Sequence, residues 1–451
     1  MKKQTISLFL IVIVLNLSLQ AFGGAFTQGN LVVYRVGDGT STYDLSKTGA
    51  APIFLDEYSI ETDGSLDLVQ SIALPTVVDG ANKRCVAVPS SYNMGYMKRS
   101  YNNRYIVVGG YDQVLGTTPW GVVASSVNRV VAFVDYNGAI NTTTALTDAY
   151  SKKDIRSVYS DDGVNVWMAG DNDATANNGH LRYTTKGSTT SIKINTLTSR
   201  VLNGYNNQLY VSGMERVYSV GTGFPIEAAA NVDITDAPNS GTSANTNGYD
   251  FSFVDLDSEN PGTKQVLYFT SATTGTIQKY SLISGVWTYN GDYALSITTS
   301  PRAMEVKVVA DGVELYVICE GSNTATGSGK LYRFKDIGGY NNAFEQQGNA
   351  VKLLDFTTSG KVIRGITWAP FNDPLSSLNQ FSKPDDFSVY LENYKIIVES
   401  LIEKPVEVYS VVGAKLFSGQ VRPGTPTELS QLQKGQVYMV KVGDQVRKVI
   451  F

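Results

Sequence analysis

The stretch SPRAMEVKVVADGVELYVICEG, residues 300–321, decides the fold because the chain repeats its pattern. An apolar strand follows an arginine, a polar turn comes next, and a second apolar strand ends at a glycine. Related stretches are KDIRSVYSDDGVNVWMAGD, TSRVLNGYNNQLYVSGM and NKRCVAVPSSYNMGYMKRSYNNRYIVVGG. A third and a weaker fourth strand pattern follow most copies, so each repeat predicts a unit of four strands.

The repeats have a regular spacing. A sixth first strand near Tyr249 lacks the arginine, and the other five begin at Arg84, Arg156, Arg200, Arg302 and Arg364. The 280 residues from the first to the last of these arginines make five intervals, which average 56 residues. Four strands at such a period are typical of a blade in a β-propeller.

The two ends of the repeat region complete each other. KVIRGITWAPF, at Arg364, has no further three strands behind it, whereas NLVVYRVG, PIFLDEYS and LDLVQSIALP near the N-terminus supply three. We therefore predict an all-β chain with a six-bladed β-propeller over residues 26–371, in which Leu31–Val36 lies beside the strand of Arg364. Seven blades are the alternative, because the 72-residue interval after Arg84 is long enough to hold a degenerate unit. We ascribe that length to the insertion GGYDQVLGTTPWGVVASSVN.

The residues outside the repeats predict an export signal and a second domain. MKKQTISLFLIVIVLNLSLQAFGGA has a lysine pair, an apolar run and small residues, so residues 1–25 read as a signal peptide. No other apolar run approaches the length of a membrane span, and we expect no transmembrane segment after signal removal. Residues 372–383, NDPLSSLNQFSK, have the composition of a linker, and the alternating pattern of residues 384–451 predicts a small β-sandwich.

The C-terminal sandwich carries a family resemblance. VEVYSVVGAKLFSG and LQKGQVYMVKVGDQVRKVIF have a tyrosine before a glycine turn, a Gly-x-x-Tyr entry to a strand, and Lys448 leading the last apolar strand. This segment resembles the C-terminal sorting domain of proteins exported by the type IX secretion system of Bacteroidetes, with SKPDDF where that family usually has an Asn-Pro segment. The resemblance implies the secretion machinery as a partner. It also implies an extracellular or cell-surface location, with the protein either released or attached to the outer membrane.

Composition excludes several classes of partner and site. With 37 basic and 41 acidic residues the net charge is −4, so no positive field exists to collect nucleic acid. Cys85 and Cys319 lie in apolar runs, and we predict buried thiols rather than a disulfide. His180 is the sole histidine and no GxSxG pattern accompanies it, so we predict neither a catalytic triad nor a multi-histidine metal site.

The arginines of the first strands are the main candidates for a ligand site. Side chains that point along the axis would place Arg84, Arg156, Arg200, Arg302 and Arg364 around one mouth of the channel, where guanidinium groups suit carboxylates or sulfates. The alternative is that each arginine bonds a neighbouring unit. Tyr111 and Trp120, on the insertion between second and third strands, are the aromatic candidates. Trp167 and Trp368 stand within strands, and we predict that they pack between units.

One acidic loop is a candidate metal site. VDLDSENPG offers Asp255, Asp257 and Glu259 at alternate positions, a spacing that can wrap calcium, although acidic residues also form ordinary turns. Calcium is the candidate cofactor, and we expect no other. No stretch holds a catalytic constellation, so we predict that the chain is not an enzyme.

These observations predict a secreted or cell-surface protein whose propeller face binds a ligand, with an anionic glycan as the first candidate. Two alternatives belong to other classes. One is a polysaccharide-acting enzyme, either a hydrolase or a lyase, which would place carboxylates together in a cleft. The other is a protein-binding adhesin or structural surface protein.

Overall fold

The computed structural model describes most of the chain. The described residues are 23–172, 178–235, 247–295, 300–320, 326–372, 387–392, 395–400, 402–410, 413–423, 425, 427–429, 432, 436–443 and 445–450. They form strands and turns, which confirms the predicted all-β class. Within these ranges no helix could cross a membrane. Most of the predicted signal peptide and of the predicted linker lies outside the described residues.

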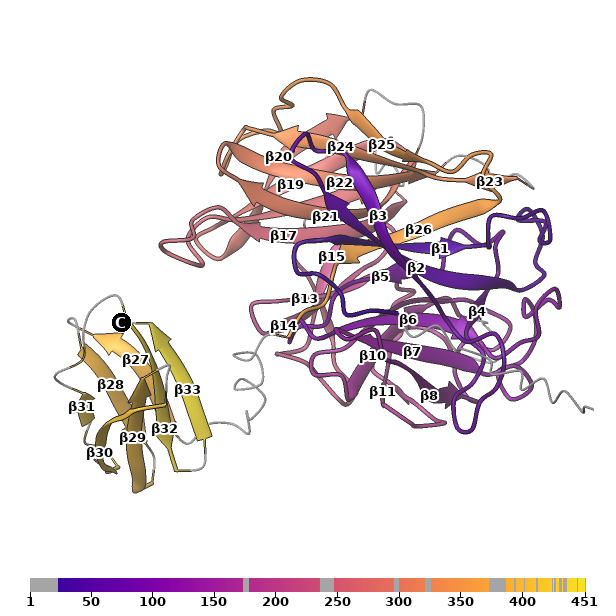
Figure 1. Cartoon of the computed structure of the whole chain (residues 1–451). Coiled ribbons are helices and arrows are strands. Elements are labelled where there is room, and N and C mark those ends of the chain that lie inside the picture. The colour runs from indigo at the N-terminus through magenta and orange to yellow at the C-terminus, as the bar shows by residue number, and fades with distance from the viewer. Residues whose placement is uncertain are drawn as a thin grey trace, which may run out of the picture.

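The first half of the main body forms a nine-stranded sheet and a five-stranded sheet (Figure 1). We divide the nine-stranded sheet into a first and a second group, which are joined where Ala51 pairs with Ala87, and we take the five-stranded sheet as the third group. The first group contains β26 (Lys361–Trp368), β1 (Leu31–Val36), β2 (Ala51–Ile60) and β3 (Leu66–Ala73). The second contains β4 (Val86–Ala87), β6 (Tyr105–Tyr111), β7 (Arg129–Asp135) and β8 (Ile140–Leu146). The third contains β9 (Ile155–Tyr159), β10 (Asn165–Gly170), β11 (Arg182–Thr185) and β12 (Ile192–Lys193), and β5 (Tyr96–Met97) adds to it in parallel.

The second half repeats the same arrangement three times. The fourth group contains β13 (Leu202–Tyr205), β14 (Gln208–Ser212), β15 (Val217–Val220) and β16 (Asn231–Asp233). The fifth contains β17 (Gly248–Asp255), β18 (Gln265–Ser271), β19 (Thr276–Ile283) and β20 (Val286–Ala294). The sixth contains β21 (Ser300–Val309), β22 (Gly312–Glu320), β24 (Lys330–Asp336) and β25 (Val351–Asp355), while β23 (Gly327–Ser328) pairs with β26.

The two ends of the main body meet in the first group. Strand β1 pairs antiparallel with β26, with Leu31 opposite Trp368 and Val33 opposite Ile366, and pairs with β2 on its other edge (Figure 1). The predicted pairing of Leu31–Val36 with the strand of Arg364 is therefore confirmed. Every residue of β1 is buried, because both edges are paired and both faces are covered by neighbouring groups.

The first strands of the groups contact one another in a closed cycle. Strand β26 contacts β5, β5 contacts β9, and the cycle continues through β13, β17 and β21 back to β26. Strand β5 takes the place of the second group's first strand in this cycle, because residues 88–98 leave that group after β4. The chain returns to the group at Arg99, which bridges to Ile106. The long interval after Arg84 thus holds an inward excursion as well as the predicted insertion.

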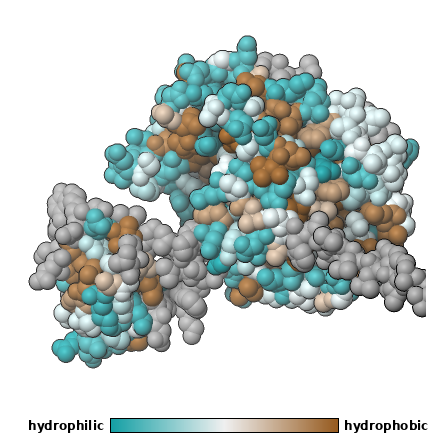
Figure 2. Space-filling model, in the orientation of Figure 1, coloured by the Kyte–Doolittle hydropathy of each residue, from teal (hydrophilic) through white to brown (hydrophobic). Residues whose placement is uncertain are grey.

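Glycine permits this excursion. A Cβ atom on Gly365 of β26 would lie 2.1 Å from the carbonyl oxygen of Gly95, so the two backbones touch. Neighbouring groups pack through apolar side chains, and Trp167 is fully buried between the third and fourth groups, as predicted. Cys85 and Cys319 are buried free thiols, which confirms that prediction. On the face in Figure 2, hydrophobic residues form separate patches among hydrophilic ones.

The C-terminal strands form two facing sheets. One contains β27 (Phe387–Glu392), β28 (Lys395–Ser400) and β31 (Thr427–Leu429). The other contains β30 (Lys415–Val421), β29 (Lys404–Ser410), β32 (Val437–Val442) and β33 (Gln445–Ile450). Apolar residues of both sheets share one core, among them Ile396, Val398, Val406, Val408 and Val440.

Candidate functional site

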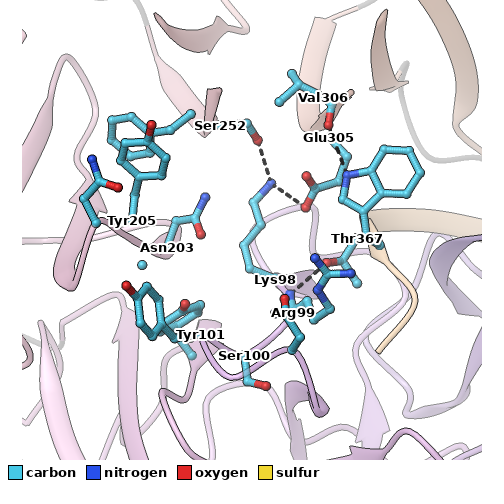
Figure 3. A pocket seen from close by; sticks show the side chains of 16 residues that line it. Lys98, Arg99, Ser100, Tyr101, Asn203, Tyr205, Ser252, Glu305, Val306 and Thr367 are labelled. Carbon is cyan, nitrogen blue, oxygen red and sulfur yellow. Dashed lines mark hydrogen bonds and ion pairs between the residues drawn. The ribbon is translucent and has the colours of Figure 1, made fainter. Parts of the chain in front are cut away.

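A pocket of about 370 Å³ lies toward the C-terminal ends of the first strands (Figure 3). Its wall takes residues from β9, β13, β17, β21 and β26, together with residues 98–103 that follow β5. A volume of this size is within the usual range for small-molecule sites. The pocket therefore gathers side chains from five groups of strands and from the inward excursion.

Lys98 forms the charged floor of the pocket. Its Nζ lies 3.2 Å from a carboxylate oxygen of Asp250 and 3.2 Å from one of Glu305. It also donates to Ser252 Oγ at 3.1 Å and to the carbonyl of Met304. An ammonium group has three protons, so these partners occupy all of them. The side chain is 2% exposed, and of the two carboxylates Glu305 lines the pocket while Asp250 lies beneath it.

Burial and charge oppose each other in this cluster. Burial acts to lower the pKa of Lys98, but Asp250 and Glu305 outweigh it and raise that pKa above the usual value. Burial raises the pKa of Asp250 to about 6, although Lys98 and the N–H of Met304 act to lower it. At neutral pH the floor therefore holds an ammonium group, and the carboxyl group of Asp250 is mostly ionised.

The excursion of residues 88–98 explains why Lys98 stands here. Along a strand successive side chains point to opposite faces, so Tyr96 and Lys98 share one face of β5 while Met97 takes the other. Met97 packs into the core between the first two groups. Tyr96 contacts Tyr249 across the ring, with 5.6 Å between ring centroids. Lys98, two residues on, reaches the carboxylates of β17 and β21.

One wall of the pocket combines aromatic rings with amide groups. Tyr205 and Phe253 stack at 4.6 Å with their planes 10° apart. Figure 3 shows Tyr101, Asn203 and Tyr205 on one side of Lys98. Flat apolar faces beside amide and hydroxyl groups suit a ligand that has both C–H faces and hydroxyl groups.

The opposite wall holds Arg99, Thr367 and Trp368. The backbone N–H of Arg99 donates to Thr367 Oγ1 at 2.8 Å, and its guanidinium group lies 5.0 Å from the ring of Phe371. Trp368 donates from Nε1 to the carbonyl of Val306 at 3.1 Å and lines the pocket, so it does more than pack between groups as predicted. Arg99 brings a positive charge to the wall in addition to the Lys98 floor.

Arg84 and Arg364 form ion pairs with acidic residues of other segments. Arg84 forms an ion pair with Asp112 at 2.8 Å. Arg364 bonds Glu320 and donates to two carbonyls of residues 88–98, at 2.8 and 3.1 Å. Both arginines therefore bond other segments of the protein, which is the alternative to ligand binding stated above. A ligand-binding role for them stays a prediction.

The other three arginines lie near one another. The guanidinium carbon of Arg200 is 3.9 Å, and that of Arg302 4.3 Å, from the ring centroid of Tyr249. Arg156 Nη1 donates to the carbonyl of Ser199, the residue before Arg200, at 3.2 Å. Burial lowers the pKa of Arg200, and the charge of Arg156 contributes to this. These three thus form one cluster, which does not line the pocket.

The two aromatic candidates, Tyr111 and Trp120, differ in burial. Tyr111 is fully buried and donates to Asp154 Oδ1 at 2.7 Å, with Arg129 over its ring. Its placement on an exposed insertion was therefore wrong, because β6 continues through residue 111 and carries the ring inward. Trp120 is 44% exposed on the insertion, which bonds to Ala50 through backbone groups, and it does not line the pocket.

The acidic loop is organised by its own hydrogen bonds. Asp255 accepts the N–H of Asp257 at 3.0 Å, and Asp257 accepts the N–H of Asn260 at 3.0 Å and pairs with Lys264 at 3.1 Å. Glu259 is exposed. Among the described residues no three His, Cys, Asp or Glu side chains are grouped so as to hold a metal ion. Calcium at this loop stays a prediction.

Comparisons with known proteins give structures but no family. No family model and no curated protein matches the chain. A structure assigned as a 6-phosphogluconolactonase of Bacteroides uniformis is 13% identical with a TM-score of 0.39, over 93% of this chain and 99% of that one. The periplasmic gluconolactonase PpgL of Pseudomonas aeruginosa is 12% identical with a TM-score of 0.37, over 89% and 99%. A soluble aldose sugar dehydrogenase of Escherichia coli is 13% identical with a TM-score of 0.37, over 63% and 92%.

The prediction that the chain is not an enzyme needs correction. The finding that stands against it is the names of three similar structures, two 6-phosphogluconolactonases and one gluconolactonase, at 10–13% identity. That prediction considered only constellations within single stretches of sequence. Lys98, Asp250 and Glu305 come from three places in the sequence, and Lys98 and Glu305 are 207 residues apart. The one feature of the sequence that could have indicated this cluster was the excess length of the interval after Arg84, which contains Lys98.

Proposed function

We propose that this chain is a secreted six-bladed β-propeller enzyme that hydrolyses a sugar-derived lactone or ester in the pocket above Lys98. The division of the main-body strands into six groups, two of which share the nine-stranded sheet, and the closed cycle of first strands support six blades rather than seven. The observation that carries the chemistry is the Glu305 carboxylate, held 3.2 Å from Lys98 at the floor of a pocket with aromatic and amide walls.

Glu305 is the general base in this proposal. It takes a proton from a water molecule while the water oxygen bonds to the carbonyl carbon and the carbonyl electrons move onto their oxygen. Arg99, on the pocket wall, stabilises the resulting oxyanion. Collapse of the intermediate breaks the bond to the ring or ester oxygen, which takes the proton back from Glu305. Lys98 is a positioning residue, because its protons are all engaged.

Glycoside hydrolysis fits this pocket less well. That reaction usually needs two carboxyl groups on opposite sides of the bond to be broken. Of the described residues that line the pocket, Glu305 alone carries a carboxyl group, since Asp250 lies beneath Lys98. One base beside cationic groups is better matched to attack on a carbonyl carbon.

The test measures acid release from an aldonolactone and from an aryl ester of a sugar, each corrected for spontaneous hydrolysis. The mature protein should accelerate at least one of them, and Glu305→Gln should lower kcat about 100-fold or more. Glu345→Gln, at an exposed carboxylate outside the pocket, is the matched control and should be unchanged. An inactive wild type, or equal rates in the Glu305 variant and wild type, would overturn the proposal.

Export is the second part of the proposal. Residues 384–451 direct the chain through the type IX secretion machinery to the cell surface or the medium. The resemblance of the last strands supports this role, as do the two-sheet core of that segment and the N-terminal signal pattern. An extracytoplasmic location also agrees with the low content of charged residues, 17%.

A further inference from the structure

The cluster of Arg156, Arg200 and Arg302 has fewer acceptors than N–H groups. Arg156 Nη1 donates to the carbonyl of Ser199 at 3.2 Å and Arg200 Nη2 donates to Asn247 Oδ1 at 2.6 Å, but other nitrogens have no such partner. Within the described residues no hydrogen-bond partner is found for Nε and Nη1 of Arg200, Nη1 of Arg302 or Nε of Arg156. The Nε of Arg302 has only its ion pair with Glu320, at 3.3 Å. All five nitrogens are buried, and Arg156 and Arg200 are 8% and 6% exposed. A buried donor without an acceptor is costly, and more so when it carries charge.

Two carboxylates lie near the positive charge of the three arginines. Asp171 lies 3.3 Å from Arg156, and it also pairs with Lys153 at 4.0 Å. Glu320 lies 3.3 Å from Arg302, but its other oxygen is taken by Arg364. Among the described residues no carboxylate pairs with Arg200, and burial together with the charge of Arg156 lowers its pKa. Burial also acts to lower the pKa of Arg302, but Tyr96, Glu320 and Tyr249 raise that pKa above its usual value, so the shortage of negative charge is centred on Arg200.

Tyr92 is a solvent-exposed neighbour of the cluster. The guanidinium carbon of Arg302 is 4.9 Å from the centroid of the Tyr92 ring, which is 41% exposed. Tyr249 lies beneath both Arg200 and Arg302, and its hydroxyl group donates to Asn93 at 3.2 Å. Aromatic faces next to guanidinium groups thus surround the place where an incoming group would meet the arginines.

We infer that Arg156, Arg200 and Arg302 form a second ligand site, which binds an oxyanion group such as a carboxylate or a sulfate. Guanidinium groups present paired N–H donors to such oxygens in a bidentate manner. The bound group supplies both the acceptors and the negative charge that the cluster lacks. Of the five arginines predicted from the sequence, these three carry the site.

This site is separate from the pocket. Arg302 and Glu305 stand on the same strand three residues apart, and so do Arg156 and Tyr159, which corresponds to about 10 Å along a strand. Tyr96 and Tyr249 fill the ring between the two ends. Binding at the arginines therefore does not depend on the chemistry proposed for Glu305.

The experiment titrates the mature protein with sulfate, phosphate and glucuronate by calorimetry, with glucose as the uncharged probe. Wild type should bind at least one anion saturably and should not bind glucose at this site. Arg200→Gln and Arg302→Gln should each weaken that anion more than tenfold. Arg84→Gln, at the same repeat position but paired with Asp112, is the matched control and should bind as wild type does.

Further arms keep the inference testable. Arg200→Lys retains the charge and loses the paired donors, so it should weaken glucuronate more than it weakens phosphate and should fold where the glutamine variant does not. Glu305→Gln should bind the anion normally, which separates this site from the pocket. The inference is wrong if wild type binds none of the three anions, or if the Arg84 variant loses as much affinity as the Arg200 variant.

Discussion

Replacing Lys98 by methionine should strongly destabilise the main body. The substitution keeps a long apolar stem but removes the ammonium group from two buried carboxylates, Asp250 and Glu305, each 3.2 Å away. Breaking one buried ion pair by removing a partner typically costs about 3–5 kcal/mol, and here a single lysine serves two carboxylates. We therefore expect the free energy of unfolding to fall by about 4–5 kcal/mol at pH 7.5.

The pH dependence follows from the same charges. Burial raises the pKa of Asp250, and without Lys98 that carboxyl group holds its proton to still higher pH than it does in the unfolded chain, so folding takes up a proton and stability falls as pH rises. The loss should be smaller at pH 5 than at pH 8. Adding Asp250→Asn to the lysine variant removes one unpaired charge and should recover about 2 kcal/mol.

Urea unfolding followed by tryptophan fluorescence measures these differences. All four tryptophans, at positions 120, 167, 287 and 368, belong to the main body, so the signal does not report on the C-terminal sheets. The reasoning fails if the lysine variant loses less than about 1 kcal/mol, or if its loss is equal at pH 5 and pH 8. It also fails if the asparagine change makes the lysine variant less stable.

Three other predictions concern different parts of the chain. Burial, with a further contribution from Asp162, raises the pKa of Asp161 to about 7, so ionisation of Asp161 lowers the stability of the wild type as pH rises from about 4 to 7. Asp161→Asn should therefore raise the melting temperature at pH 8 and not at pH 4, and the opposite trend would refute this. Gly365→Ala should lower the free energy of unfolding by about 1–3 kcal/mol in the same urea assay, because its methyl group would meet the Gly95 carbonyl, and an unchanged value would show that β5 can move aside. Deleting residues 434–451 removes β32 and β33 from their sheet and should leave the protein in the periplasm of its own host, as measured by fractionation; normal levels at the surface or in the medium would disprove the sorting role.

The repeat could be found from sequence because strand pairing within a group is local. The strands of each group are mostly consecutive in the sequence, and the three extra strands at the N-terminus matched the strands missing behind Arg364. The inward excursion could not be found this way. Residues 88–98 read as a loop, and the place of β5 between β26 and β9 depends on contacts with distant strands.

The candidate sites show the same division between local and distant contacts. Five arginines share one repeat position, but their partners differ, since Arg84 meets Asp112 and Arg364 meets Glu320. A repeat pattern cannot tell which arginines lack a carboxylate, because the carboxylates lie on other elements. Lys98 carried no motif at all, and its role depends on residues that lie more than 150 positions further along the chain.

The main body cannot be completed until β26 has been synthesised, because β26 pairs with one edge of β1. Roughly 325 residues separate the two strands, so at 5–20 residues per second a ribosome needs roughly 16–65 s to make the second after the first. During that time the apolar strand LVVYRV has one open edge, which is a template for pairing with other nascent chains. A chain that ends before residue 361 therefore keeps this strand edge open, whereas the full-length chain covers it with β26.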